Sequence, residues 1–119
     1  EAIAPLVDHP QVVAIGVNCT PPRLMPELVQ EIGRFSTKPI ILYPNSGEHY
    51  DAVDKCWHGE ADPNEFGTIS REWRKLGASI IGGCCRTTPA HIQQLRDRFA
   101  KPAAYETILS KAHVGEFKP

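Results

Sequence analysis

The sequence has 119 residues, of which 41% are hydrophobic and 23% charged, and its formal net charge is −1. This balance is typical of a folded globular protein and excludes a disordered chain. It has no basic excess and no apolar run near the roughly 20 residues of a membrane helix, so we expect neither nucleic acid nor a membrane as a partner.

Hydrophobic patterning predicts strands and helices that alternate along the chain. A short helix is expected to end near residue 9, before Pro10. The strands are expected at 12–19, 38–43 and 78–83, and the helices at 22–34, 62–77 and 89–99. A long polar loop is expected at 48–61, and a carboxy-terminal tail at 101–119. The pattern predicts three consecutive βα units, an α/β protein with parallel strands and right-handed crossovers.

The second expected strand is apolar from Ile40 to Tyr43, which predicts burial on both faces of a parallel sheet. Three such strands are too few to shield both faces and the edges of a sheet. Two arrangements meet this requirement. Either the chain is part of a larger barrel or doubly wound sheet, or it self-associates through its exposed sheet edges.

Cysteines follow the first and third of the expected strands. Cys19 ends the first strand, and Cys84 and Cys85 follow the third after two glycines. The carboxyl ends of parallel strands are where α/β proteins place their chemistry. Three thiolates gathered there would form a zinc site with one open position, as a catalytic zinc requires. The alternative is that these cysteines are buried and inert, but their matching positions favour the metal site.

The fourth cysteine, Cys56, lies in the expected polar loop, and we interpret it as a bystander. Four cysteines would allow two disulfides in a secreted protein, but the adjacent Cys84 and Cys85 are poorly placed to pair with each other. The first residues lack the basic start and long apolar core of a signal peptide. We therefore expect reduced thiols and a cytoplasmic location.

Three motifs carry a resemblance to a known family. They are Gly16-Val17-Asn18-Cys19, Tyr43-Pro44-Asn45-Ser46-Gly47 and Gly82-Gly83-Cys84-Cys85-Arg86-Thr87. With these motifs in this order and spacing, the sequence resembles the homocysteine S-methyltransferase family from about residue 12 to residue 99. It looks closest to the branch that uses S-methylmethionine or S-adenosylmethionine as the methyl donor.

The resemblance implies a (β/α)8 TIM barrel with a catalytic zinc. Residues 1–100 would form its carboxy-terminal portion, about strands 6–8, and residues 101–119 a tail. Cys19, Cys84 and Cys85 would be the three protein ligands of Zn2+. No catalytic residue is expected beyond this metal site.

Three further residues are expected near the substrate or the open zinc position. Asn45 matches an asparagine in the family's seventh-strand loop, where it would fill or line that position; the alternative is a turn residue. Asn18 and the amides of Gly82 and Gly83 are expected to donate hydrogen bonds to the sulfurs. Arg86 would either hold a carboxylate or form an ion pair on the surface.

The implied function is zinc-dependent transfer of a methyl group from a sulfonium donor to homocysteine, which gives methionine. Zinc would lower the pKa of the homocysteine thiol, so that its sulfur reacts as a thiolate. The family's first five strands have no counterpart in the 119 residues, so the match implies a parent enzyme, and the chain alone is expected to be inactive.

Two other functions remain as alternatives. The first is a truncated, inactive fragment that self-associates or binds zinc structurally. The second is a redox dithiol protein, which is disfavoured because Cys84 and Cys85 lack the two-residue spacer of the common motif.

Overall fold

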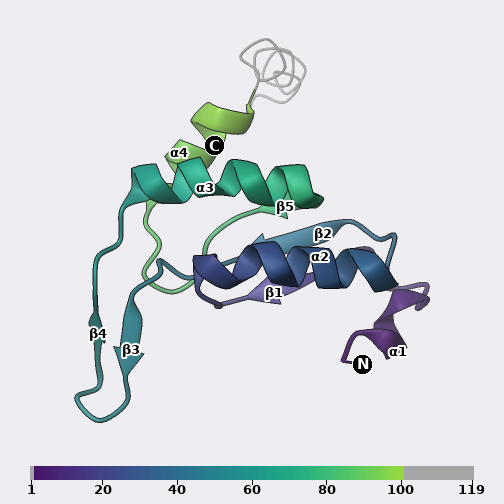
Figure 1. The fold of residues 1–119 in the computed structure, drawn as a ribbon, viewed down its shortest axis with the longest axis horizontal. Helices are drawn as coiled ribbons and strands as arrows, with labels where there is room; N and C mark the ends of the chain where they lie inside the picture. The colour runs from purple at the N-terminus through teal and green to yellow at the C-terminus, as the bar shows by residue number, and fades with distance from the viewer. Residues whose placement is uncertain (1, 101–119) are drawn as a thin grey trace, which may run out of the picture.

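Residues 2–100 are described by a computed structural model, in which helices and strands alternate (Figure 1). In chain order the elements are α1 (Ala4–Val7), β1 (Ile15–Asn18), the 3-10 helix η1 (Pro22–Leu24), α2 (Met25–Phe35), β2 (Ile40–Tyr43), β3 (His49–Asp51), β4 (Cys56–His58), α3 (Pro63–Leu76), β5 (Ala78–Ile81) and α4 (Pro89–Phe99). The predicted α/β class and its order of three βα units are therefore found, with shorter strands than expected.

The central sheet has the strand order β1-β2-β5, and both neighbouring pairs are parallel. Ile15 lies opposite Ile40 in the first pair, and Leu42 lies opposite Ile81 in the second. The carboxyl ends of all three strands consequently meet at one edge of the sheet. The loops that leave this edge carry the cysteines that the sequence singled out.

Helix ends follow local signals in the sequence. The Asp62 carboxylate accepts a hydrogen bond of 2.8 Å from the amide of Asn64 and so caps α3, which begins at Pro63. Gly77 ends that helix with a φ of 125°, which glycine adopts at little cost. At α4, the His91 ring and the Thr88 hydroxyl complete a capping box ahead of the helix.

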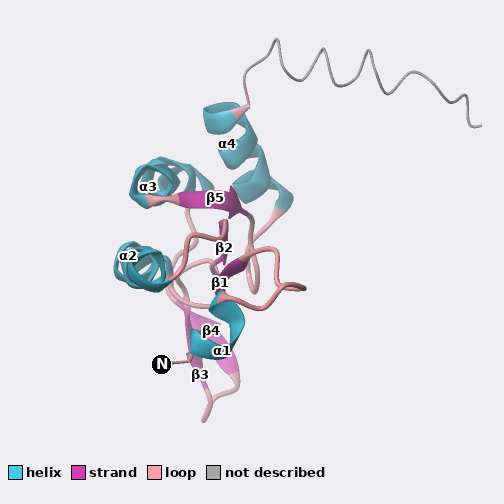
Figure 2. Cartoon of the chain, turned by 90° about the vertical axis from the view of Figure 1, so that its right-hand side faces the viewer, coloured by secondary structure: helices cyan, strands magenta, loops and turns pink. Residues whose placement is uncertain are grey.

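Helices α2 and α3 lie side by side on one face of the sheet (Figure 2). Their apolar faces bury the largest core side chains, among them Met25 at 0% and Trp73 at 1% exposure. The core residues are Ile15, Met25, Val29, Ile32, Ile40, Leu42, Phe66, Trp73, Ala78 and Leu95. This single layer of core fixes the spacing of β1, β2 and β5 and hence of the loops that follow them.

The expected burial of β2 on both faces is wrong for residues 2–100. Ile40 and Leu42 point toward the helices and are buried. Tyr43 points to the opposite face of the sheet and is 40% exposed. In β5, Ile80 is 45% exposed as well. The alternation arises because, within the described residues, α2 and α3 cover one face of the sheet and leave the other open.

Two further expectations differ from the structure. The polar loop at 48–61 contains an antiparallel hairpin, β3 and β4, which projects away from the sheet (Figure 1). The first strand covers Ile15–Asn18 instead of 12–19, so Cys19 lies just beyond it and is exposed. The predicted tail at 101–119 lies outside the described residues.

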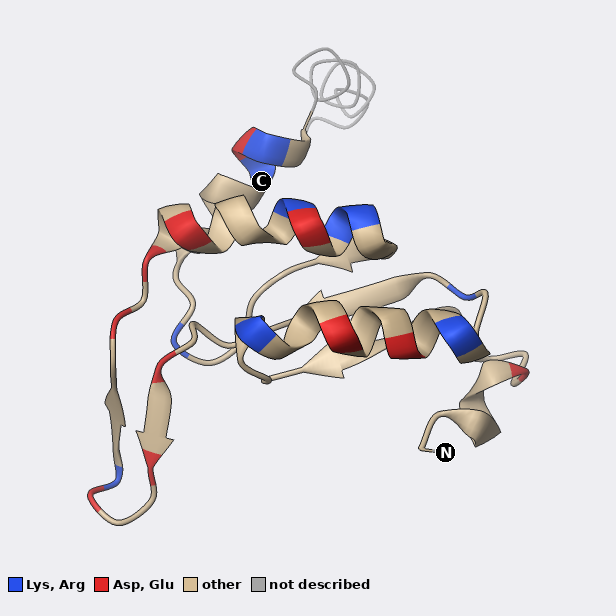
Figure 3. Cartoon of the chain, viewed as in Figure 1, with Lys and Arg blue, Asp and Glu red and all other residues tan. Residues whose placement is uncertain are grey.

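Charged side chains of both signs are interspersed along α2 and α3 (Figure 3). Among residues 2–100, no helix is both long and apolar enough to cross a membrane.

The close approach of β1 to β2 generates a prediction at Gly16. A Cβ there would lie 1.6 Å from the carbonyl oxygen of Ile41, so Gly16→Ala should lower the free energy of unfolding by about 1–3 kcal/mol or more. Gly33, inside α2, has no atom within 4 Å of the equivalent position, so Gly33→Ala is the matched control. It should raise stability by up to about 1 kcal/mol, because alanine favours helix. Urea unfolding measures both; equal stability of Gly16→Ala and the unsubstituted chain would contradict this packing.

Candidate metal centre

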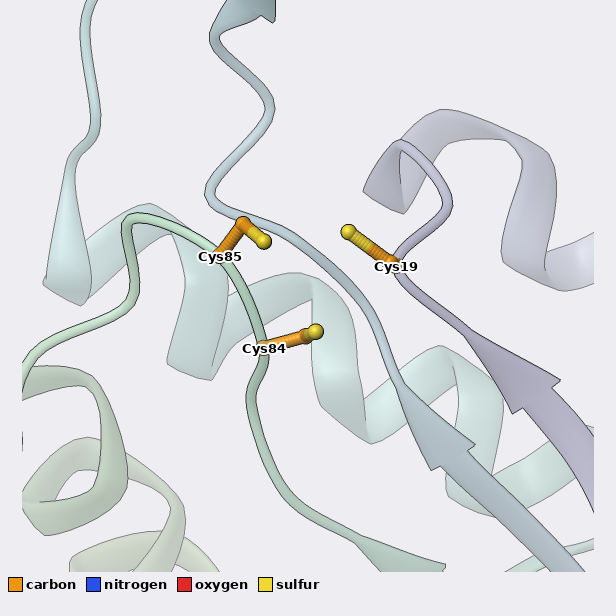
Figure 4. A group of neighbouring side chains, drawn as sticks. All are labelled: Cys19, Cys84 and Cys85. Atoms are coloured by element: carbon orange, nitrogen blue, oxygen red, sulfur yellow. The ribbon is translucent and has the colours of Figure 1, made fainter.

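Three cysteine sulfurs converge at the carboxyl edge of the sheet. Cys19 follows β1, and Cys84 and Cys85 follow β5, and their Sγ atoms all lie within 4.8 Å of one another. Figure 4 shows the three side chains directed toward a common point from two separate loops. The structure thus brings together the three residues that the sequence predicts as zinc ligands, and all four cysteines of the chain are free thiols.

The loop after β2 lies between the two cysteine loops and is hydrogen-bonded to both. On one side, the amide of Cys19 donates to the carbonyl of Tyr43 at 2.7 Å. On the other, the amide of Cys84 donates to the carbonyl of Pro44 at 2.9 Å, and the amide of Ser46 donates to the carbonyl of Cys85 at 3.1 Å. These bonds continue the sheet pairing past the strand ends and set the separation of the thiols.

Cys19 adopts a backbone conformation that is unusual for its residue type. Its φ is 48°, in the left-handed region, where a residue with a Cβ costs roughly 1–2 kcal/mol relative to ordinary conformations. The hydrogen bond to Tyr43 and a 3.4 Å hydrogen bond from the side-chain amide of Asn45 to the Cys19 carbonyl hold it there. The turn directs the thiol back across β2 toward Cys84 and Cys85 (Figure 4).

Asn45 is 5% exposed, and both ends of its side chain contact backbone groups. Its Oδ1 accepts a hydrogen bond of 2.9 Å from the amide of Gly47, and its Nδ2 donates to Cys19. Of the two expectations for Asn45, this arrangement fits the turn residue, which here also positions a thiol. The side chain acts on the site through Cys19.

The Arg86 guanidinium forms a two-point ion pair with Glu48. Its Nε and Nη2 donate to the two carboxylate oxygens at 3.1 and 3.2 Å. Glu48 is 8% exposed and also accepts a hydrogen bond from the Ser46 hydroxyl at 2.9 Å. Arg86 therefore binds a carboxylate of the chain itself, next to the loop that separates the cysteines. Glu48 was missed by sequence reasoning, which placed it only at the start of a polar loop.

Two of the expected hydrogen-bond donors to the sulfurs, Asn18 and the amide of Gly82, are arranged differently. Asn18 is exposed at the end of β1, and its side chain makes no hydrogen bond with the described residues. The amide of Gly82 donates to the carbonyl of Leu42 at 2.9 Å, as part of the sheet pairing. That amide is therefore engaged by the backbone and does not serve a sulfur.

Hydrogen bonds among the thiols shift the pKa values of Cys19 and Cys85 in opposite directions. The pKa of Cys19 is lowered, because the thiols of Cys85 and Cys84 donate hydrogen bonds that favour its thiolate. The same hydrogen bond to Cys19, followed by that to Cys84, raises the pKa of Cys85 to about 11. Thiolates this close together repel one another, and a divalent cation bound between them would relieve that repulsion.

The donor set and its spacing fit zinc. Zn–S bonds of about 2.3 Å in a tetrahedron require sulfurs about 3.8 Å apart, within the 4.8 Å that contains these three. Three thiolates would leave one of the four tetrahedral positions of zinc for another ligand. The residues that would hold the ion are Cys19, Cys84 and Cys85.

A family model described as homocysteine S-methyltransferase matches residues 1–99. The chain belongs to the homocysteine S-methyltransferase family. The family expected from the three motifs is thereby confirmed, and its match includes every described residue of the metal centre.

Curated relatives agree with this assignment. The chain is 48% identical over 90 residues to homocysteine S-methyltransferase YbgG of Bacillus subtilis, which covers 76% of this chain and 29% of that protein. It is 42% identical over 99 residues to homocysteine S-methyltransferase of Escherichia coli, covering 82% of this chain and 32% of that protein. Selenocysteine Se-methyltransferase of Brassica oleracea is 41% identical over 106 residues, which cover 87% of this chain and 31% of that protein. The chain thus spans about a third of the length of these members.

Solved structures of a family member have the same fold. The oxidized form of the homocysteine methyltransferase MmuM from Escherichia coli matches with a TM-score of 0.65 and 36% identity, over 82% of this chain and 28% of that one. The metallated form of the same enzyme matches with a TM-score of 0.63 and 34% identity, over 81% of this chain and 27% of that one. A family member with this arrangement of strands therefore has a metal-bound form.

The contacts of Asn45 predict a change in zinc affinity. Asn45→Ala removes the hydrogen bond that holds the Cys19 turn, and we expect zinc to bind about 10–100-fold more weakly. Asn18→Ala is the matched control, because its side chain makes no such contact, and it should change affinity little. Competition with a chromophoric chelator measures both; equal losses in the two variants would contradict a positioning role for Asn45.

The ion pair between Glu48 and Arg86 predicts a stability that depends on pH. Hydrogen bonds from Arg86 and then Ser46 lower the pKa of Glu48 from its usual value of 4.5. Its ionised form therefore stabilises the fold above that usual pKa, and the contribution disappears as the pH falls through the lowered pKa. Glu48→Gln should destabilise the chain near neutral pH, and its stability should approach that of the unsubstituted chain as the pH falls below the usual value of 4.5. The midpoints of urea unfolding of both proteins across this pH range test the prediction. A difference in stability that persists in acid would contradict it.

Proposed function

We propose that this chain is the zinc-binding, carboxy-terminal part of a (β/α)8 barrel enzyme that transfers a methyl group from a sulfonium donor to homocysteine. The donor would be S-methylmethionine or S-adenosylmethionine, and the product methionine. The observation that carries the proposal is the convergence of the Cys19, Cys84 and Cys85 sulfurs within 4.8 Å at the carboxyl edge of a parallel sheet. The names of the family relatives support methyl transfer, and the metallated form of MmuM supports a metal.

A zinc ion bound there would lower the pKa of a coordinated thiol and keep the sulfur of homocysteine deprotonated near neutral pH. The chain's own part is to supply three negatively charged, electron-rich sulfur ligands, which leave an added thiolate nucleophilic. The homocysteine sulfur would form a bond to the methyl carbon while the bond to the sulfonium sulfur breaks. The donor would then leave as a neutral thioether.

The residues around the thiols would keep the site in place and take no part in proton transfer. Asn45 would maintain the turn that directs Cys19, through its hydrogen bond to the Cys19 carbonyl. Arg86 and Glu48, whose carboxylate lies at hydrogen-bond distance from Ser46, would fix the loop that separates the two cysteine segments. Because the Arg86 guanidinium already binds Glu48, the carboxylate of homocysteine would be bound by other parts of the enzyme.

One observation favours a second candidate, in which the chain by itself binds zinc without turnover. The sheet face opposite α2 and α3 exposes Tyr43 and Ile80, at 40% and 45%. Apolar surface of this kind on a parallel sheet favours a further layer or a second copy of the chain. Sedimentation of the 119-residue chain together with a methylation assay separates the candidates, because a monomer with turnover would exclude the silent fragment.

Replacement of one thiol tests the proposed chemistry. Cys84→Ser should abolish both zinc retention and methylation of homocysteine in the enzyme that contains this chain, since the remaining two thiolates bind the ion weakly. The unsubstituted protein, stripped with a chelator, should regain activity when zinc is returned, whereas Cys84→Ser should not. Selenocysteine offered in place of homocysteine tests the acceptor, because some relatives are named for it.

Full activity of the Cys84→Ser enzyme, with circular dichroism showing the native fold, would refute the zinc-dependent mechanism. If the unsubstituted enzyme binds zinc but methylates neither acceptor, the proposed metal centre would stand and the proposed transfer reaction would be refuted.

A further inference from the structure

The hairpin formed by β3 and β4 has two chemically different faces. Its register pairs Tyr50 with Trp57, and their rings are 5.3 Å apart. The neighbouring pairs are His49 with His58 and Asp51 with Cys56. Because side chains alternate along a strand, these two pairs share the face opposite the aromatic rings. One face is therefore aromatic, and the other carries two imidazoles, a thiol and a carboxylate.

The turn of the hairpin adds another carboxylate to this group. The Asp51 carboxylate accepts hydrogen bonds from the amides of Val53 and Asp54, at 2.7 and 3.1 Å, and so folds the turn. Lys55 completes it with a φ of 54°. Figure 3 shows acidic and basic residues together at this end of the hairpin. The turn returns Asp54 toward the start of β4.

Three potential metal ligands converge as a result. One carboxylate oxygen of Asp54, the Sγ of Cys56 and a ring nitrogen of His58 all lie within 4.8 Å of one another. Cys56 Sγ and His58 Nε2 are 3.1 Å apart. Cys56 and His58 are two residues apart on one strand, so β4 itself directs both side chains to the same side.

The combination of donors selects a class of ion. Calcium and magnesium prefer sites built from oxygen, whereas a thiolate with an imidazole suits zinc and its neighbours in the transition series. Sulfur, nitrogen and oxygen ligands are all found in tetrahedral zinc sites. Cys56, which the sequence analysis treats as a bystander, is the ligand that gives this group its preference for such an ion.

We propose that Asp54, Cys56 and His58 form a second metal site, separate from the three-cysteine centre, which binds a divalent transition-metal ion such as Zn2+. Water completes the coordination. The ion joins the turn to β4 and stabilises the hairpin. The two sites share no ligand, so the ligands of one can be replaced while those of the other are kept.

Zinc stoichiometry tests the second site. The 119-residue chain is loaded with zinc, passed through a desalting column to remove loosely bound ions, and analysed for metal and protein. We expect two zinc ions per chain, and one in the double variant Cys56→Ala/His58→Ala. His9→Ala, which removes an exposed histidine outside both groups, is the matched control and keeps two. If the three-cysteine centre does not load in this chain, the expected counts become one and zero, so the outcome remains independent of the proposed enzyme.

Cobalt provides a second readout that identifies the ligands. Co2+ bound through a thiolate gives a sulfur-to-metal charge-transfer absorption. When the spectrum of cobalt-loaded Cys56→Ala/His58→Ala is subtracted from that of the cobalt-loaded unsubstituted chain, the difference should show this band. Equal zinc content and identical cobalt spectra in these two proteins would overturn the proposal. So would an equal loss of zinc in the His9→Ala control, which would indicate non-specific binding to surface histidines.

Discussion

The hydrogen bonds made by the loop after β2 are the constraint on which the metal centre depends. This loop donates to or accepts from backbone groups on both sides, at Cys19 before it and at Cys84 and Cys85 after it. Each such bond contributes only about 1 kcal/mol net to stability. Their effect on geometry is larger, because they connect each of the two cysteine loops to the same central segment, residues 43–46. Residues far apart in the sequence therefore present their sulfurs to one another at a few ångströms.

That constraint is itself a consequence of the sheet. Parallel pairing of β2 with both β1 and β5 places β2 in the middle, so its loop is the one element that can contact both others. On one face, the sheet packs against α2 and α3. Glu48 and Arg86 then tie the end of the central loop to the residue that follows Cys85. Sheet pairing, helix packing and the Glu48–Arg86 ion pair together position the thiols.

Much of this arrangement was predictable from the sequence, for identifiable reasons. Helix starts at Asp62-Pro63 and Thr88-Pro89 are local signals, and the structure has both helices where they indicate. The convergence of the cysteines followed from a general property of parallel strands, whose carboxyl ends share an edge. The family assignment rested on three motifs that are short but fixed in order and spacing.

Other features lay beyond the reach of sequence patterns. The hairpin at 49–58 has strands of three residues, too short for alternation to distinguish them from a polar loop. The partner of Arg86 depended on how the loop after β2 folds back toward the residues that follow Cys85. The exposure of Ile80 depended on which face of the sheet the helices cover. In each case the deciding contact joins residues that are distant in the chain or depends on the packing of whole elements.

The most direct test of the account is the position of zinc in a crystal of the zinc-loaded protein, located by anomalous scattering at the zinc edge. The account predicts an ion bonded to the sulfurs of Cys19, Cys84 and Cys85, each at about 2.3 Å. A structure in which the Cys19 thiol points away from the other two, with no ion between them, would contradict it.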